Sequence, residues 1–348
     1  MDGDTGTDGS AHERSRAGGV GRLFWNPSER RLRTPWRLGL GAVAFAALVW
    51  LVNRGTSAVT PAVAPAGPAA GAVAGVVLYL AFTAVLFGGL VAISYVLDRR
   101  TTADLGLSLD GRWWRDAGVG AAVGAALAAA VVGVELASGL AAVSDVAQVR
   151  PFGVPPFPPG FPVPAALALA ALVLVAVSAF EELAVRGYLL TNLAEGLNGV
   201  GSLGARGAVA VATLATAALF GLLHAASPGA TPLSVLNVSL FGVLLGLGYA
   251  LTDRLGVSIG LHLAWNAFVG GVFGLPVSGV TVGVTVLAVE QRGPALVTGG
   301  DFGPEGGLVA LPAVALGLGL LWAWARYSDA GGLRPAVAVP TLRSGDGD

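Results

Sequence analysis

The stretch "PAALALAALVLVAVSAFEELAVRGYLL", residues 164–190, is apolar along almost its whole length and carries three charged side chains near its end. A helix of about 20 mostly apolar residues is long enough to cross the hydrocarbon core of a bilayer. Ionisable groups inside such a helix are costly, so they normally face a protein interior or a water-filled cavity. We therefore predict a membrane span that presents polar side chains to a site within the protein.

The composition of the whole chain points the same way. Of its 348 residues, 54% are hydrophobic and only 12% are charged, and the mean hydropathy is +0.74, which is outside the range of ordinary soluble domains. We predict an all-α, polytopic membrane helix bundle of about eight transmembrane helices, located in the cell membrane as a multi-pass protein. The expected spans are 36–52, 69–97, 117–143, 164–190, 207–226, 232–251, 255–275 and 306–326.

The basic residues, all of them arginine, indicate the orientation. Sixteen arginines lie on one side of the predicted spans and three on the other, and the twentieth is Arg186 within the stretch quoted above. Positive residues concentrate in cytosolic loops, so both termini are predicted to be cytosolic. The expected organisation is a polar, disordered tail over 1–34, a transmembrane domain over 35–327 with its motif core at 164–275, and a polar tail over 328–348. The first span is expected to remain as an uncleaved anchor.

Charge and cysteine content exclude several classes of function. The formal net charge of −1 gives no reason to expect a nucleic acid partner. Because the chain contains no cysteine, a disulfide, a thiolate nucleophile and a cysteine-ligated metal are all excluded. The lipid bilayer is the partner that the composition itself implies.

The three charges of the quoted stretch are not equivalent. Glu182 and Arg186 are four residues apart, with the acid first, which is the favourable order for an ion pair within a helix. Glu181 points about 100° around the helix from Glu182 and has no partner in its own segment. Glu181 is therefore the candidate free carboxylate, able to act as a general base on water.

Two of the three histidines lie in predicted membrane helices. His224 ends "FGLLH" in the fifth span, and His262 begins "HLAWN" in the seventh, one helical turn before Asn266. A single buried histidine more often bonds helix to helix than it binds a ligand. Together, one free glutamate, two histidines and an asparagine leave two alternatives open: a Glu/His/His metal site, or a Glu-activated water with polar groups that stabilise an oxyanion.

These residues resemble a known family. "EELAVR", "FGLLH" and "HLAWN" match, in order, the EExxxR, FxxxH and HxxxN motifs of the CPBP intramembrane proteases, a family that includes the type II CaaX prenyl endopeptidases and bacteriocin-processing proteins. The resemblance implies an intramembrane endopeptidase with catalytic residues Glu181, His224, His262 and Asn266, supported by Glu182 and Arg186. It also implies a membrane-associated peptide or protein substrate, which can be lipidated.

The cofactor is an open choice at this point. Glu181, acting without a metal, would take a proton from the attacking water, with His262 and Asn266 on the oxyanion and His224 orienting the water. If zinc is bound, Glu181, His224 and His262 would be its ligands and the role of base would pass to Glu182.

Rival functions use fewer of these residues. "GVSIG", residues 256–260, matches GxSxG and suggests Ser258 as a nucleophile, but that motif needs a strand-to-helix turn. A transporter would require repeat-related broken helices, and a non-catalytic immunity or chaperone-like membrane protein would use the cluster for stability alone. One geometric demand follows from the predicted spans: upright helices would put His224 nearer the outer face than Glu181 and His262. We therefore expect either a fifth helix that tilts or breaks, or a segment "HAASPGATP", residues 224–232, that dips back into a cavity.

Overall fold

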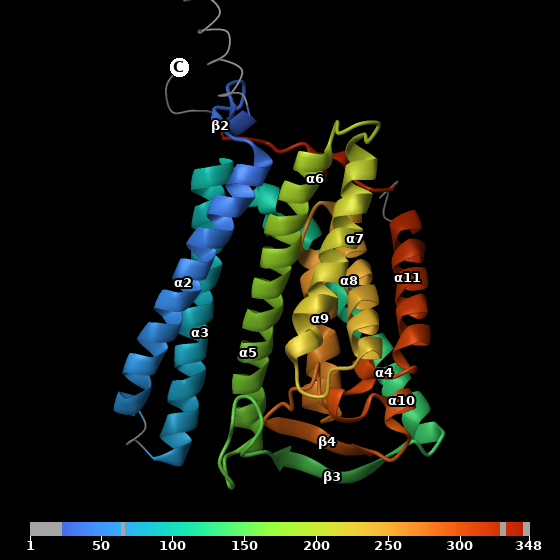
Figure 1. Ribbon diagram of the computed structural model, residues 1–348. Helices are drawn as coiled ribbons and strands as arrows, with labels where there is room; N and C mark the ends of the chain where they lie inside the picture. Colours follow the sequence, from blue (N-terminus) through green and yellow to red (C-terminus); the bar gives the residue numbers. More distant parts are fainter. Residues whose placement is uncertain (1–22, 64–66, 328–331, 344–348) are drawn as a thin grey trace, which may run out of the picture.

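The computed structural model describes residues 23–63, 67–327 and 332–343, and in these segments the protein is mostly helical, which confirms the predicted fold class (Figure 1). Seven of the described helices are long and apolar enough to cross a membrane. An eighth, shorter apolar helix spans Gly256–Val272. The main helices are α2 (Thr34–Val63), α3 (Pro68–Ile93), α4 (Gly111–Ala137), α5 (Val163–Glu182), α7 (Ala205–Leu223), α8 (Pro232–Thr252), α9 (Gly256–Asn266) and α11 (Ala310–Tyr327).

Each predicted span corresponds to one of these helices. The first helix ends at Val63 rather than at 52, and the difference that bears on the site is in the fourth. Helix α5 continues without interruption through a π-helical segment, η4 (Leu183–Leu190), and into α6 (Thr191–Leu197). The whole helix, Val163–Leu197, is 35 residues long. It therefore extends past the predicted end at 190, which changes the depth of the residues it carries.

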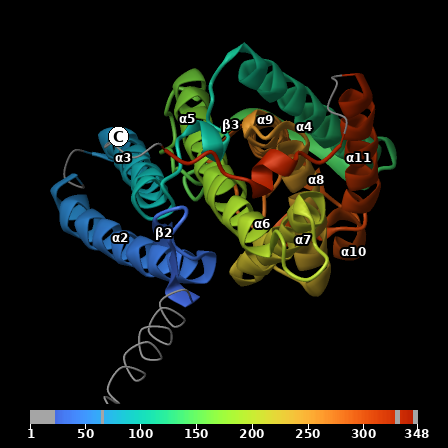
Figure 2. The ribbon, with the colours of Figure 1, turned by 90° about the horizontal axis from the view of Figure 1, so that it is seen from above.

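The helices form two groups on either side of α5. Helices α2 and α3 pack together as a pair, and α3 contacts α5. On the other side of α5 stand α4, α7, α8, α9 and α11, with α4 against α9 and α7 against α8. Figures 1 and 2 both show α5 between the α2–α3 pair and this larger group. The centre of the protein is thus the space among α5, α7, α8 and α9.

A two-stranded sheet that was not predicted lies across one end of the bundle. Strand β3 (Ala141–Val149) pairs antiparallel with β4 (Val284–Gln291), and Figure 1 shows the sheet below α5, α9 and α4. The third span was expected to reach 143, but its helix ends at Ala137 because Gly139 adopts a left-handed φ of 72°. The short helix α10 (Ala295–Thr298) follows β4 at the same end.

The opposite end is held by buried charges. Arg31, Arg37 and Arg100 all donate to the carboxylate of Glu195 on α6, at 2.6 to 2.8 Å. Arg31 belongs to a small hairpin, β1 (Trp25–Asn26) and β2 (Arg31–Leu32), that precedes α2. The predicted disordered tail, 1–34, is therefore folded from Leu23 onward, and its first 22 residues lie outside the described part of the chain.

Both ends of the described chain meet at this end of the bundle. The backbone N–H of Arg343 donates to the carbonyl of Arg99 at 3.0 Å, close to the β1–β2 hairpin, which Arg31 joins to Asp98. An even number of membrane crossings would produce this arrangement. Of the predicted C-terminal tail, 328–348, only residues 332–343 are described.

Candidate functional site

The three predicted motifs lie where regular α-helices end. Helix α5 changes to the π-helix η4 directly after Glu182, and α9 changes to the π-helix η6 (Ala267–Val272) directly after Asn266. Helix α7 ends at Leu223, and His224 begins a single 3₁₀ turn, η5 (His224–Ala226). Short π and 3₁₀ segments inside helices often mark functional sites, because they redirect side chains that a straight helix would align. Here they turn the motif residues toward one space.

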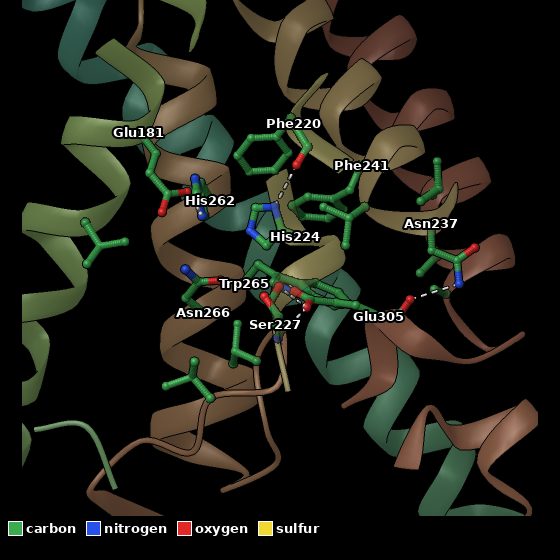
Figure 3. Close-up of a pocket in the computed structure, with 18 of the residues that line it drawn as sticks. Glu181, Phe220, His224, Ser227, Asn237, Phe241, His262, Trp265, Asn266 and Glu305 are labelled. Atoms are coloured by element: carbon green, nitrogen blue, oxygen red, sulfur yellow. Dashed lines mark hydrogen bonds and ion pairs between the residues drawn. The ribbon is translucent and has the colours of Figure 1, made fainter. Parts of the chain in front are cut away.

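That space is a cavity of about 300 Å³ among α5, α7, α8 and α9. Glu181, His224, His262 and Asn266 all line it. Figure 3 shows Glu181, His262 and His224 around the same opening, with Asn266 beside Trp265. The structure thus brings together the four residues that the sequence motifs selected, from three separate helices.

Glu182 and Arg186 form the ion pair predicted from their spacing. The Arg186 guanidinium donates to Glu182 Oε1 at 2.8 Å, and both side chains are fully buried. Arg186 also donates to the carbonyl of Gly242 at 3.1 Å and lies over the ring of Phe220 at 4.5 Å. The pair therefore ties α5 to α7 and α8 behind the cavity.

His262 joins this pair, a contact that the sequence analysis did not predict. His262 Nδ1 lies 2.9 Å from Glu182 Oε1. Because a carboxylate paired with arginine can only accept hydrogen bonds, Nδ1 must carry the proton and donate. The other ring nitrogen, Nε2, is left facing Glu181 at 3.8 Å. The buried acid therefore fixes both the position and the tautomer of the imidazole.

Glu181 has a different environment from its neighbour in sequence. Its side chain is 33% exposed, whereas that of Glu182 is fully buried. It also lines a second hollow, of about 580 Å³, between the α2–α3 pair and α5. No hydrogen bond joins its carboxylate to another described residue. This acid is thus available to water, as the helix geometry predicted.

His224 and Asn266 also present free polar atoms. His224 Nδ1 lies 2.7 Å from the Phe220 carbonyl, and since a carbonyl only accepts, Nδ1 is the donor and Nε2 has no hydrogen-bond partner among the described residues. Asn266 is 7% exposed, and its amide forms no hydrogen bond within the described part of the chain. Buried polar groups without partners are expected where a ligand supplies them.

The extended α5 resolves the predicted difference in depth. Glu181 lies sixteen residues before the end of its helix at Leu197, and His224 lies nineteen residues after the start of its helix at Ala205. At 1.5 Å per residue these distances are about 24 and about 28 Å from the same end of the bundle. His224 therefore reaches nearly the depth of Glu181, and the fifth helix need not break before it.

Glu305 is a cavity residue that the sequence analysis missed. It lies in a single 3₁₀ turn, η8 (Pro304–Gly306), before α11, and it lines the same cavity. Its carboxylate accepts from Trp265 Nε1 at 2.6 Å. The only signal in the sequence is one acid in the Gly- and Pro-rich segment "DFGPEGG" just before an apolar span, which is also the composition of an ordinary surface turn.

Two alternatives from the sequence can be compared with this geometry. Ser258 is fully buried, donates to the Leu245 carbonyl at 2.8 Å and is not among the residues that line the cavity, so it is not placed to attack a substrate there. In the described part of the chain, no three His, Asp or Glu side chains are arranged so that they could hold a metal ion. Glu181, His224 and His262 thus share a cavity without forming a set of metal ligands.

The fold and the site define a multi-pass membrane protein with a buried, polar Glu/His/Asn cavity. Residues 163–268 match the family model described as type II CAAX prenyl endopeptidase Rce1-like, and the match includes all three motifs. This match confirms the resemblance to the CPBP proteases over the segment that carries the three motifs. The family implies a membrane-embedded peptide or protein substrate. No curated protein and no solved structure matches the chain.

Proposed function

We propose that this protein is an intramembrane endopeptidase in which Glu181 activates the water that cleaves the peptide bond. The observation that carries the proposal is that the adjacent acids Glu181 and Glu182 have different environments. Glu182 is committed to Arg186 and His262, whereas Glu181 faces the cavity with its nearest basic group 3.8 Å away, at His262 Nε2. One acid builds the site and the other is free to exchange a proton.

The reaction would begin with water between Glu181 and His224. Glu181 takes a proton from the water, and the hydroxyl oxygen attacks the carbonyl carbon of the scissile bond. His224 Nε2, left free by the bond from Nδ1 to Phe220, accepts a hydrogen bond from the same water and orients it. The products of this step are a protonated Glu181 and a tetrahedral oxyanion.

The oxyanion would be stabilised from the α9 side of the cavity. Asn266 can donate from its unpartnered amide. His262, with a carboxylate near each ring nitrogen, can carry both ring protons and donate from Nε2. When the tetrahedral intermediate breaks down, the carbon–nitrogen bond cleaves and Glu181 returns its proton to the departing amine. Protons and electrons then balance without an additional reactant.

A zinc ion is the alternative to Glu181 as the group that activates the water. If bound by Glu181, His224 and His262, it would lower the pKa of its water and polarise the carbonyl. The arrangement of these three side chains does not form a ligand set, so the proposed steps use the residues alone. Activity that survives exhaustive chelation would support the metal-free route, and activity restored only by zinc would reject it.

The test is cleavage of a membrane reporter by purified, reconstituted protein. Glu181→Gln should lower kcat/KM by roughly 10²–10⁴-fold, and Asn266→Ala should lower it by about 10²–10³-fold because one oxyanion donor is lost. The matched control is Glu290→Gln, the same change at an exposed acid of β4, which should leave kcat/KM unchanged.

Two results would reject the proposal. If Glu181→Gln cleaves the reporter as fast as the wild type, Glu181 is not the base. If folded wild-type protein cleaves no reporter at all, the polar cluster serves a non-catalytic function such as an immunity or chaperone role. Thermal unfolding of each variant in detergent shows whether a loss of activity is simply a loss of fold.

A further inference from the structure

Glu305 places a second carboxylate in the cavity, outside the segment that matches the family model. It is 8% exposed. Oε1 accepts from Trp265 Nε1 at 2.6 Å, and Oε2 accepts from the backbone N–H and the hydroxyl of Ser278 at 2.7 and 2.6 Å. Figure 3 shows it beyond His224 and Trp265, on the far side of the cavity from Glu181.

No cation balances this charge in the described part of the chain. All three donors to Glu305 are neutral, and no arginine forms an ion pair with it. The cavity lining contains no arginine, and the chain has no lysine anywhere. A buried charge that lacks a counter-charge is costly, so it is normally compensated by whatever binds beside it.

The remaining hydrogen-bonding capacity of this region fits a cationic donor. A carboxylate has about four acceptor positions, and Glu305 uses three. Asn266, 7% exposed and without a hydrogen-bond partner among the described residues, lines the same cavity with a further acceptor, its side-chain carbonyl. Guanidinium and ammonium groups carry several donors and no acceptor. An arginine or lysine side chain that enters the cavity would therefore supply the donor that Glu305 can still accept.

The negative charges of the cavity would repel an anion bound nearby. A CAAX-type substrate ends three residues after its cysteine, which places the terminal carboxylate only about 10 Å from a bond cleaved beside that cysteine in an extended chain. Glu181 and Glu305 face the cavity from its two sides, and no arginine in its lining offsets them. A terminal carboxylate bound in this cavity would meet two like charges and no partner.

We propose that Glu305 forms a specificity subsite for a basic side chain, so that the preferred substrate is an internal peptide bond flanked by arginine or lysine rather than a bond next to a free C-terminus. This inference rests on the proposed endopeptidase function. It makes Glu305 a binding residue, distinct in role from Glu181, and it assigns a task to a loop outside the segment that matches the family model.

The experiment compares reporter peptides that differ in one charge. A cleaved peptide is synthesised with arginine, citrulline or glutamate at each of three positions on either side of the bond, and each version is made with a free or an amidated C-terminus. Citrulline matches arginine in shape and lacks the charge. For wild-type protein, arginine at one position should raise kcat/KM over citrulline by about tenfold or more, glutamate should lower it, and amidation should help peptides that end near the bond.

Variants show whether Glu305 binds the substrate or only supports the fold. In Glu305→Gln the arginine-to-citrulline ratio should fall to near one. Trp265→Phe and Ser278→Ala each remove one donor and keep the charge, so the ratio should persist in both even if their overall rates fall. The wild-type ratio is informative on its own if Glu305→Gln does not fold.

The outcomes distinguish this inference from the function it rests on. Equal cleavage of arginine and citrulline peptides by wild-type protein, or an equal loss on both in Glu305→Gln, overturns the subsite while the endopeptidase remains. Failure of the wild type to cleave any peptide overturns the proposed function, and the subsite with it.

Discussion

Arg186 stabilises the site by pairing with Glu182, a buried carboxylate that would otherwise have no counter-charge. It is fully buried between Glu182, the Gly242 carbonyl and the ring of Phe220. Removing one member of a buried ion pair leaves the other charge without compensation, which costs more than the pair itself contributes. Glu182 would then depend on His262 alone, and the position of His262 would no longer be fixed by an ionised partner.

Arg186→Met should therefore destabilise the folded protein by roughly 3–5 kcal/mol, because it leaves Glu182 buried and unpaired. The double variant Glu182→Gln with Arg186→Met should recover most of that loss, since an amide can still accept from His262 Nδ1 without carrying a charge. Chemical unfolding in detergent, followed by tryptophan fluorescence, measures both. Equal stability of Arg186→Met and wild type would mean that water or lipid headgroups reach Glu182, contrary to its complete burial.

Among the helices, α4 and α9 approach one another through glycine. A Cβ built at Gly120 would overlap the Val257 carbonyl, and one at Gly260 would overlap the Ala117 carbonyl. Small residues at such crossings let helix backbones pack closely inside a membrane. Because α9 carries His262 and Asn266, the close contact between α4 and α9 fixes how deep in the bundle these two site residues lie.

Gly120→Ala should accordingly destabilise the bundle by about 1–3 kcal/mol and reduce activity, because the added methyl group forces α4 and α9 apart. The matched control lies on the same helix: a methyl group added at Gly118 would have no neighbouring atom within 4 Å. Gly118→Ala should be neutral or stabilise by up to about 1 kcal/mol through helix propensity. Thermal unfolding and reporter cleavage measured on both variants provide the comparison, and equal effects at the two positions would rule out a close α4–α9 contact.

The sequence predicted the helices well and their ends less well. Hydropathy averages over a whole segment, so each predicted span corresponds to a described helix, seven of which are long enough to cross a membrane, but the signal weakens where polar residues enter. The fourth span was predicted to end at 190, before the polar residues Thr191, Asn192 and Glu195. In the structure these residues continue the helix, with Glu195 neutralised by three arginines. Only the fold supplies those arginines, which come from distant segments.

For the candidate site, too, local sequence patterns predicted some features and the fold supplied the rest. Local spacing selected six residues, since residues four apart on a helix share a face; they are Glu181, Glu182, Arg186, His224, His262 and Asn266. Glu305 was not among them, because its partners Trp265 and Ser278 are 40 and 27 residues away in the chain. The contact of His262 with Glu182 was missed for the same reason. Local patterns predict which helix face carries chemistry, and the packing of helices decides which atoms meet.

The whole molecule has a pronounced asymmetry of charge along its long axis. One end carries the β1–β2 hairpin, the arginines around Glu195 and the last described residues. The other carries the β3–β4 sheet and the proline-rich loop of residues 150–164, with Arg150 and Arg292. If positive residues set the orientation, the Glu195 end faces the cytosol.

The absence of cysteine from the chain allows this orientation to be tested without removing any background label. Phe152 is 98% exposed at the sheet end, and Arg112 is exposed at the start of α4 toward the Glu195 end. In intact cells a membrane-impermeant maleimide should label Phe152→Cys and leave Arg112→Cys unlabelled until the membrane is permeabilised, while wild type stays unlabelled throughout. The reverse pattern would invert the predicted topology, and labelling of both in intact cells would mean that these two ends are not separated by the bilayer.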